Sequence, residues 1–201
     1  QMAHQRGVQV MVDGAHCTGH FDFNIRDLEC DYYGASLHKW LAVPLGTGLL
    51  YVQNEHIDDI WPIFAESPKE PGDVSRLNHT GTHPVYHDLS IEAAIEYYLK
   101  IGPKRKEDRL RYLQEYWTSK VRNHPNIIVN TPIASQRACG IANVGIKDMP
   151  PGEMAKTLMD KYKIFTVAID YANVHGCRVT PNVFTLTNEL DLFVEALNEM
   201  A

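Results

Sequence analysis

A lysine stands where an apolar strand ends, and this placement limits what the chain can fold into. Residues 31–36 read as a strand with an apolar and aromatic run, Tyr32, Tyr33 and Ala35, which the pentapeptide Ser36-Leu37-His38-Lys39-Trp40 closes. A second apolar run, 48–52, follows a glycine-rich turn. Only residues 41–47 separate the two runs, which is too short for a crossover helix. We therefore expect two antiparallel neighbouring strands.

Lys39 is chemically unusual at such a position. Desolvating an ammonium group is costly, so a lysine beside aromatic side chains at a strand end tends to lose its proton. A neutral amine is a nucleophile that can form a Schiff base, and pyridoxal phosphate is the commonest aldehyde resident in proteins. The alternative is a lysine that reaches solvent past Trp40, and these five residues alone do not decide between the two.

A second strand, 8–13, ends in a carboxylate, a glycine and a histidine. A buried carboxylate needs a cation, and the protonated pyridine nitrogen of pyridoxal phosphate would supply one to Asp13. Ligands of open α/β sheets bind beyond the carboxyl ends of the strands, where Asp13 and Lys39 both lie. We predict that these two residues hold opposite ends of one cofactor ring.

A zinc site is the competing interpretation of the same region, because it holds four side chains of the kinds that zinc prefers: His16, Cys17, His20 and Cys30. Their spacing matches no usual zinc pattern. Zinc would also leave Asp13 and Lys39 unexplained, so we predict no metal here.

The motifs Val12-Asp13-Gly14-Ala15-His16 and Ser36-Leu37-His38-Lys39-Trp40 resemble the class V aminotransferase family of fold-type I pyridoxal-phosphate enzymes, and within it the isopenicillin N epimerase-like branch. The resemblance implies that Lys39 is the Schiff-base lysine and that Asp13 pairs with the pyridine nitrogen. It places His16 near the phenolic oxygen of the cofactor. It also makes Ser36 and His38 phosphate-side ligands. Cysteine desulfurases, a sister branch, usually carry glutamine where His16 stands, which favours the epimerase-like branch.

A long irregular segment, 54–86, follows, and loops of this length are uncommon unless they are functional. Its tail, Asn78-His79-Thr80-Gly81-Thr82, resembles the family's glycine–threonine loop. The resemblance implies that Gly81 and Thr82 reach the cofactor phosphate of the other subunit of a homodimer. Backbone amides beside a glycine and a threonine hydroxyl suit an anion.

Residues 87–100 have apolar side chains at a helical period, which Gly102-Pro103 interrupts and which then resumes to residue 121. In the family a long bent helix links the large and small domains. We therefore assign 1–101 to the carboxyl-terminal part of the large cofactor-binding domain and 102–201 to the small carboxyl-terminal domain. The latter reads as an α/β unit with strands at 127–129, 141–146, 165–169 and 177–180, and helices at 151–162 and at 188–200 after an N-cap at Thr187.

Arg178 is a charged residue in an apolar strand of that unit, and such an arginine needs a carboxylate. The resemblance implies that Arg178 holds the α-carboxylate of the substrate with two hydrogen bonds. The alternative is a structural ion pair with a surface acid. The following Thr180-Pro181 also matches the family motif and favours the functional role.

Composition limits the partners. A net charge of −6 and a pI near 5.9 argue against nucleic acid, and no apolar run approaches the roughly 20 residues that cross a membrane. The four cysteines form neither C-x-x-C pairs nor a dense disulfide scaffold, which predicts a reducing, cytoplasmic compartment. Residues 1–7 read as a helix end stopped by Gly7, so we expect the chain to begin mid-protein. The resemblance implies that roughly the first half of the enzyme is absent.

The expected fold is therefore α/β, the carboxyl-terminal part of a type I PLP-transferase fold, with part of the large-domain sheet plus the small α/β domain. The expected function is that of a pyridoxal-phosphate enzyme acting on an amino acid or amino-acid-derived peptide, as an epimerase or aminotransferase. The 201 residues alone are expected to be inactive. The alternatives are a cysteine desulfurase-like lyase, an inactive folded or oligomerising fragment, and a metal-binding module.

Overall fold

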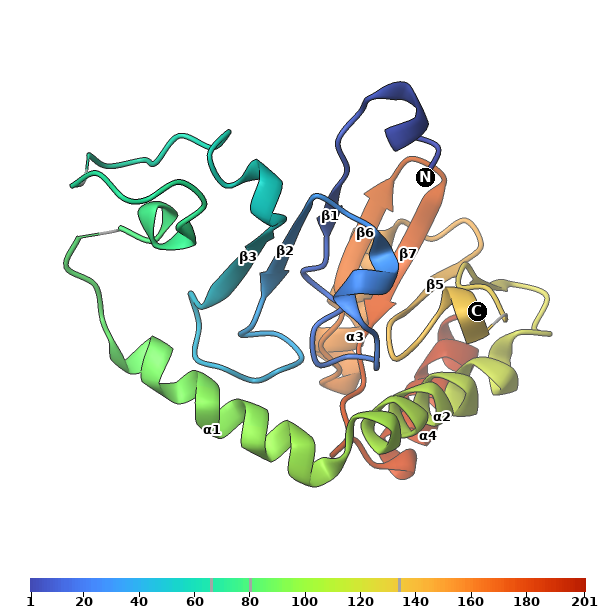
Figure 1. The fold of residues 1–201 in the computed structure, drawn as a ribbon. Coiled ribbons are helices and arrows are strands. Elements are labelled where there is room, and N and C mark those ends of the chain that lie inside the picture. Colours follow the sequence, from blue (N-terminus) through green and yellow to red (C-terminus); the bar gives the residue numbers. More distant parts are fainter. Residues whose placement is uncertain (66, 80, 134) are drawn as a thin grey trace. The chain divides into compact units, whose positions relative to one another are not determined.

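The computed structural model describes residues 1–65, 67–79, 81–133 and 135–201, except for the side chain of Ser135. It divides into two compact units, Gln1–Pro103 and Lys104–Ala201, and each is described here by itself (Figure 1). No helix among the described residues is both long enough and apolar enough to span a bilayer.

The first unit is built on a three-stranded sheet in the order β1-β2-β3, with β2 in the middle (Figure 1). Strand β1 (Met11–Asp13) runs parallel to β2 (Tyr32–Ser36), and β2 pairs antiparallel with β3 (Gly48–Val52). The antiparallel pairing predicted from the short 41–47 connection is confirmed. Short 3₁₀ helices and the helix α1 complete the unit, at His4–Arg6, Ile25–Leu28, Asn54–His56, Val74–Leu77 and, for α1, Tyr86–Ile101.

The two faces of this sheet differ because side chains alternate along a strand. On one face Tyr33 and Ala35 are buried, with Val12 and Tyr51 packed against them. On the other face Met11 is 67% exposed, and the side chains around it border an open hollow. The apolar residues after β2 form a second small core with α1, made of Leu37, Leu41, Val43, Ile91, Ala94 and Tyr98.

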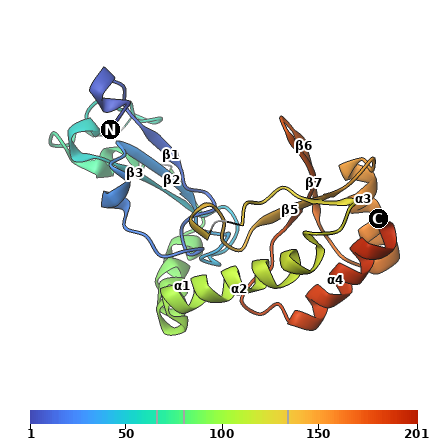
Figure 2. The same cartoon turned by 90° about the vertical axis from the view of Figure 1, so that its right-hand side faces the viewer.

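The second unit is a four-stranded antiparallel sheet in the order β4-β5-β7-β6. Its strands are β4 (Ile127–Val129), β5 (Ala142–Ile146), β6 (Val167–Tyr171) and β7 (Val174–Val179), and its helices are α2 (Pro103–Val121), α3 (Pro151–Tyr162) and α4 (Thr187–Met200). Figure 2 shows α2 and α4 side by side, on the same side of β5 and β7.

One core joins these helices to one face of the sheet. Leu113, Trp117 and Val121 recur every four residues along α2 and are fully buried. They pack with Val144 of β5 and Leu197 of α4 in the same cluster. The opposite face of the sheet carries Asn143 and Arg178 beside apolar side chains such as Ile128 and Tyr171.

Four local predictions need correction. Strand β1 begins at Met11 instead of residue 8. Strand β6 begins at Val167 instead of residue 165, and β7 begins at Val174 instead of residue 177. Thr187 is the first residue of α4 and not its N-cap. Leu186 precedes the helix, and its N–H donates to the Glu189 carboxylate at 2.7 Å, so an acid in the first turn replaces the expected hydroxyl cap.

Candidate functional site

The turn after β1 depends on a close approach that only glycine permits. The N–H of Gly14 donates to the carbonyl of Gly34 at 2.7 Å and so continues the β1–β2 pairing. A Cβ on Gly14 would lie 2.0 Å from the Tyr33 ring, whose hydroxyl donates to the Gly14 carbonyl at 3.3 Å. This packing fixes where the chain leaves the strand, and therefore where Asp13 stands.

Asp13 and Ser36 both border the open hollow of about 720 Å³ on the uncovered face of the sheet. Asp13 pairs with Gly34, two residues before Ser36, so the two polar side chains share that face. The Asp13 carboxylate accepts a hydrogen bond from the Ala15 N–H at 3.0 Å and is otherwise exposed. The hollow is lined by Met11, Asp13, Ala15, Gly34, Ala35, Ser36, Gly48, Leu49 and Leu50.

Lys39 lies against His16, the last residue of the first motif. The Lys39 Nζ is 3.3 Å from His16 Nε2, and the Trp40 indole N–H donates to His16 Nδ1 at 3.2 Å. A neutral imidazole has one N–H, and the indole can only donate. The proton of His16 is therefore on Nε2, so the imidazole presents an N–H to the lysine amine.

Trp40 and His20 pack against the His16 turn and fix its position. Trp40 is buried, and its ring stacks on His20 with centroids 3.9 Å apart and an interplanar angle of 5°. His20 Nδ1 in turn lies 2.9 Å from the His16 carbonyl. His20 thus packs against the turn that holds His16. Among the described residues, the group of side chains that could hold a metal ion lies elsewhere, at Asp31, Glu55 and His56.

His38 points to the loop before β3, with Nδ1 3.2 Å from the carbonyl of Thr47. A carbonyl only accepts, so Nδ1 carries a proton and Nε2 remains as the second polar atom of the ring. Gly81 and Thr82 are exposed in the segment before α1, and Gly81 adopts a positive φ of 71°. Thr80 of the same predicted loop lies outside the described residues.

Arg178 lies on β7 in the second unit, opposite Asn143 of β5 and Val167 of β6. Among the described residues its guanidinium has no carboxylate partner, and its buried Nε has no hydrogen bond. The structural ion pair considered from the sequence is therefore not found in this part of the chain.

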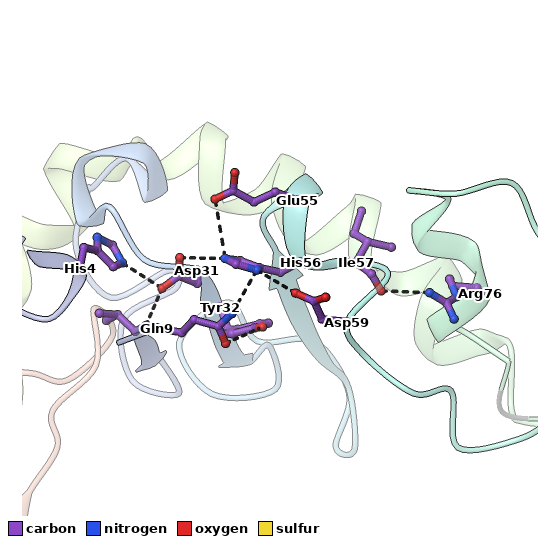
Figure 3. A network of polar contacts seen from close by, with 10 residues as sticks. His4, Gln9, Asp31, Tyr32, Glu55, His56, Ile57, Asp59 and Arg76 are labelled. Atoms are coloured by element: carbon purple, nitrogen blue, oxygen red, sulfur yellow. Dashed lines mark hydrogen bonds and ion pairs between the residues drawn. The ribbon is translucent and has the colours of Figure 1, made fainter. Parts of the chain in front are cut away.

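The sequence reasoning missed a polar network around Asp31 (Figure 3). The buried Asp31 carboxylate accepts from the Val10 N–H and lies 2.9 Å from His4 Nε2 and 3.2 Å from His56 Nε2. The Val10 hydrogen bond, followed by those from His4 and His56, lowers the pKa of Asp31 to about 2. Hydrogen bonds to Asp59 and Asp31 raise the pKa of His56. The only sequence signal was a charged residue directly before the strand β2.

Comparison with known proteins places this geometry in context. The family model "Aminotransferase class-V" matches residues 1–170. An isopenicillin N epimerase of Streptomyces clavuligerus is 25% identical over 98% of the chain and 54% of its own length. A probable cysteine desulfurase of Halalkalibacterium halodurans is 27% identical over 79% of the chain and 40% of its own length.

Solved structures agree in fold. The apo structure of a cysteine desulfurase from Thermococcus onnurineus NA1 matches with a TM-score of 0.86 and 21% identity, over 99% of this chain and 54% of that one. The chain spans about half the length of these relatives. Since the family model covers most of its residues, the chain belongs to the class V aminotransferase family.

Proposed function

We propose that the chain is the carboxyl-terminal part of a pyridoxal-phosphate enzyme that acts on an amino acid or an amino-acid-derived peptide, as an epimerase or aminotransferase. The observation that carries this proposal is the 3.3 Å contact between Lys39 Nζ and His16 Nε2, at the turn that also presents Asp13. An amine, an imidazole N–H and a carboxylate at the ends of adjacent strands suit a cofactor with an aldehyde, a phenolic oxygen and a ring nitrogen.

The residues fit this cofactor by their chemistry. Lys39 would hold it covalently as a Schiff base, and Asp13 would keep the ring nitrogen protonated, so that the bound cofactor supplies an electron sink. The His16 N–H would face the phenolic oxygen or the lysine amine. Ser36 and His38 would bind the phosphate.

The remaining roles involve other parts of the intact protein. Gly81 and Thr82 would complete the phosphate site of a second subunit, which makes the intact enzyme a homodimer. Arg178 would bind the substrate carboxylate. We retain residues 1–101 as part of the large domain and 102–201 as the small domain. Four cysteines without a disulfide suit the reducing conditions of the cytoplasm.

Lys39 also has a role in proton transfer. With its amine free, Lys39 would take the α-proton of the substrate and return it. His16 Nε2, which lies 3.3 Å from Lys39 Nζ, would position that amine between the two transfers and release its lone pair when the amine takes the proton. A transfer of this kind serves epimerisation and transamination alike.

The test is the visible absorbance of the intact protein with pyridoxal phosphate. We expect a band above the protein absorbance that Lys39→Ala abolishes. The matched control is Lys156→Ala, because Lys156 is exposed on α3 and should leave the band intact. A colourless wild-type protein, or a band that survives in Lys39→Ala, would refute the enzyme assignment.

A further inference from the structure

Two buried N–H groups without partners stand opposite each other on the second sheet. Among the described residues, neither Arg178 Nε nor Asn143 Nδ2 has a hydrogen bond. The two residues are direct partners in the β5–β7 ladder. Their neighbours Val144 and Cys177 point into the core beneath the helices, so Arg178 and Asn143 both project from the opposite face.

The orientation of the Asn143 amide is fixed by its neighbours. The carbonyl of His175 can only accept, and Asn130 Nδ2 lies 3.1 Å from it. The same Asn130 NH₂ donates to Asn143 Oδ1 at 2.7 Å. Since the oxygen of Asn143 is engaged in this way, its NH₂ group must point away from Asn130 and is left unpaired.

A glycine makes room for this arrangement. A Cβ on Gly176 would lie 2.8 Å from Asn143 Oδ1 and 2.4 Å from the Val144 carbonyl. Any other residue at position 176 would have to displace the Val144 carbonyl, the Asn143 amide or both. The unpaired NH₂ is therefore built into the local packing.

The missing partner must be an anion rather than water alone. Native proteins leave few buried donors unsatisfied, because the lost hydrogen bond is costly. Arginine stays protonated, and no described carboxylate neutralises Arg178. A carboxylate accepts several hydrogen bonds in one plane and so can satisfy a guanidinium and an amide together.

We infer that Asn143 is a second donor to the carboxylate that Arg178 binds, and that Asn130 positions its amide. The ligand class is the α-carboxylate of an amino acid or peptide, so the inference rests on the proposed function for its biological ligand. The pairing of Asn143 with Arg178 is specific to this sheet and follows from the two unpaired donors.

Acetate tests the inference without the cofactor. In the intact protein labelled with ¹⁵N-arginine and ¹⁵N-asparagine, the Arg178 Nε–H and Asn143 NH₂ signals should shift together and saturably as acetate is added. Asn143→Ala should weaken acetate binding at Arg178 at least fivefold. Asn173→Ala makes the same change in the exposed turn between β6 and β7 and should leave the affinity unchanged.

The possible outcomes are distinct. The inference is overturned if the Arg178 signal shifts but wild type and Asn143→Ala bind acetate with equal affinity. It is also overturned if neither the Arg178 nor the Asn143 signal shifts. Asn130→Ala keeps both donors but frees the amide, and a two- to threefold loss with this variant supports the inference even where Asn143→Ala does not fold. Acetate binding by a protein without a Lys39-dependent band would refute the proposed function and leave this inference standing.

Discussion

Trp40 sets the tautomer of His16, the residue that contacts Lys39, through a single hydrogen bond. Its indole N–H donates to His16 Nδ1 at 3.2 Å, and this keeps the His16 proton on Nε2. Trp40→Phe removes the donor but retains a ring that can stack on His20. We expect the Nε2–H form of His16 to lose about 1 kcal/mol of preference, roughly fivefold, which ¹⁵N shifts of the imidazole would report. An unchanged tautomer ratio would show that the indole does not control His16.

The Asp31 network makes the stability of the first unit depend on pH. Because the folded pKa of His56 is raised, its contribution is complete below its ordinary value of 6.5 and is lost as pH rises through the raised pKa. The Asp31 pKa is lowered from 3.8 to about 2, so its contribution is present above 3.8 and is lost as pH falls toward 2. The unit should therefore be most stable between these two limits.

Denaturant unfolding between pH 5 and 9 checks the alkaline limb of this prediction. Asp59 is the first cause of the raised His56 pKa and is exposed, so Asp59→Asn should flatten the loss of stability above pH 6.5 without disturbing the fold. An alkaline limb of equal slope in wild type and Asp59→Asn would exclude His56 as its origin.

At the scale of single residues, the sequence indicated which side chains are reactive more readily than which side chains form hydrogen bonds with each other. Lys39 and Asp13 could be singled out because a charged residue at the end of an apolar strand is costly without a partner. Asn143 gave no such signal, since an asparagine in a half-exposed strand looks like ordinary surface. Its unpaired NH₂ depends on Asn130 and Gly176, whose positions relative to Asn143 are set only by the strand register.

At the level of elements, the end of α3 carries a conformational cost. Lys163 follows the helix with φ 60° and ψ 30°, a left-handed conformation that favours glycine. Lys163→Gly should stabilise the protein by about 0.5–1 kcal/mol. The same substitution at Lys156, inside α3, should destabilise it by about 1 kcal/mol. Thermal or denaturant unfolding of the two variants should give shifts of opposite sign, and shifts of equal sign would contradict this account.

The elements themselves were largely predictable. The bounds of β3, β4 and α3 agree with the sequence pattern, because apolar periodicity and flanking glycine or proline define them locally. The start of α4 was not predictable in the same way. Thr187 has the side chain of an N-cap, but the Glu189 carboxylate accepts from the Leu186 N–H instead. Composition does not show which of two competing local hydrogen bonds is the stronger. The ends of β6 and β7 shifted because hairpin register depends on the turn between them.

At the scale of the whole molecule, the relatives include two chemistries, epimerisation and cysteine desulfuration, and the thiols of this chain bear on the choice. A desulfurase needs a reactive thiolate that can reach the bound substrate. None of the four cysteines forms a disulfide, and burial raises the pKa of Cys17, Cys139 and Cys177. Cys30 is only 2% exposed. None of these residues has the environment of an attacking thiolate.

We therefore predict that these four thiols transfer no sulfur, and that the α-proton of a substrate exchanges with solvent. Intact protein should be incubated in deuterated water with amino acids and short peptides, with cysteine as a separate substrate. Deuterium should enter the α-position, and Lys39→Ala should abolish the exchange, because this variant lacks the amine that is proposed to move the proton. Exchange with loss of chirality and no keto acid would identify an epimerase, whereas keto acid would identify an aminotransferase. Sulfide release from cysteine that disappears when Cys17 is changed to serine would overturn this prediction, since Cys17 lies in the same turn as His16 and is the thiol nearest in sequence to Asp13.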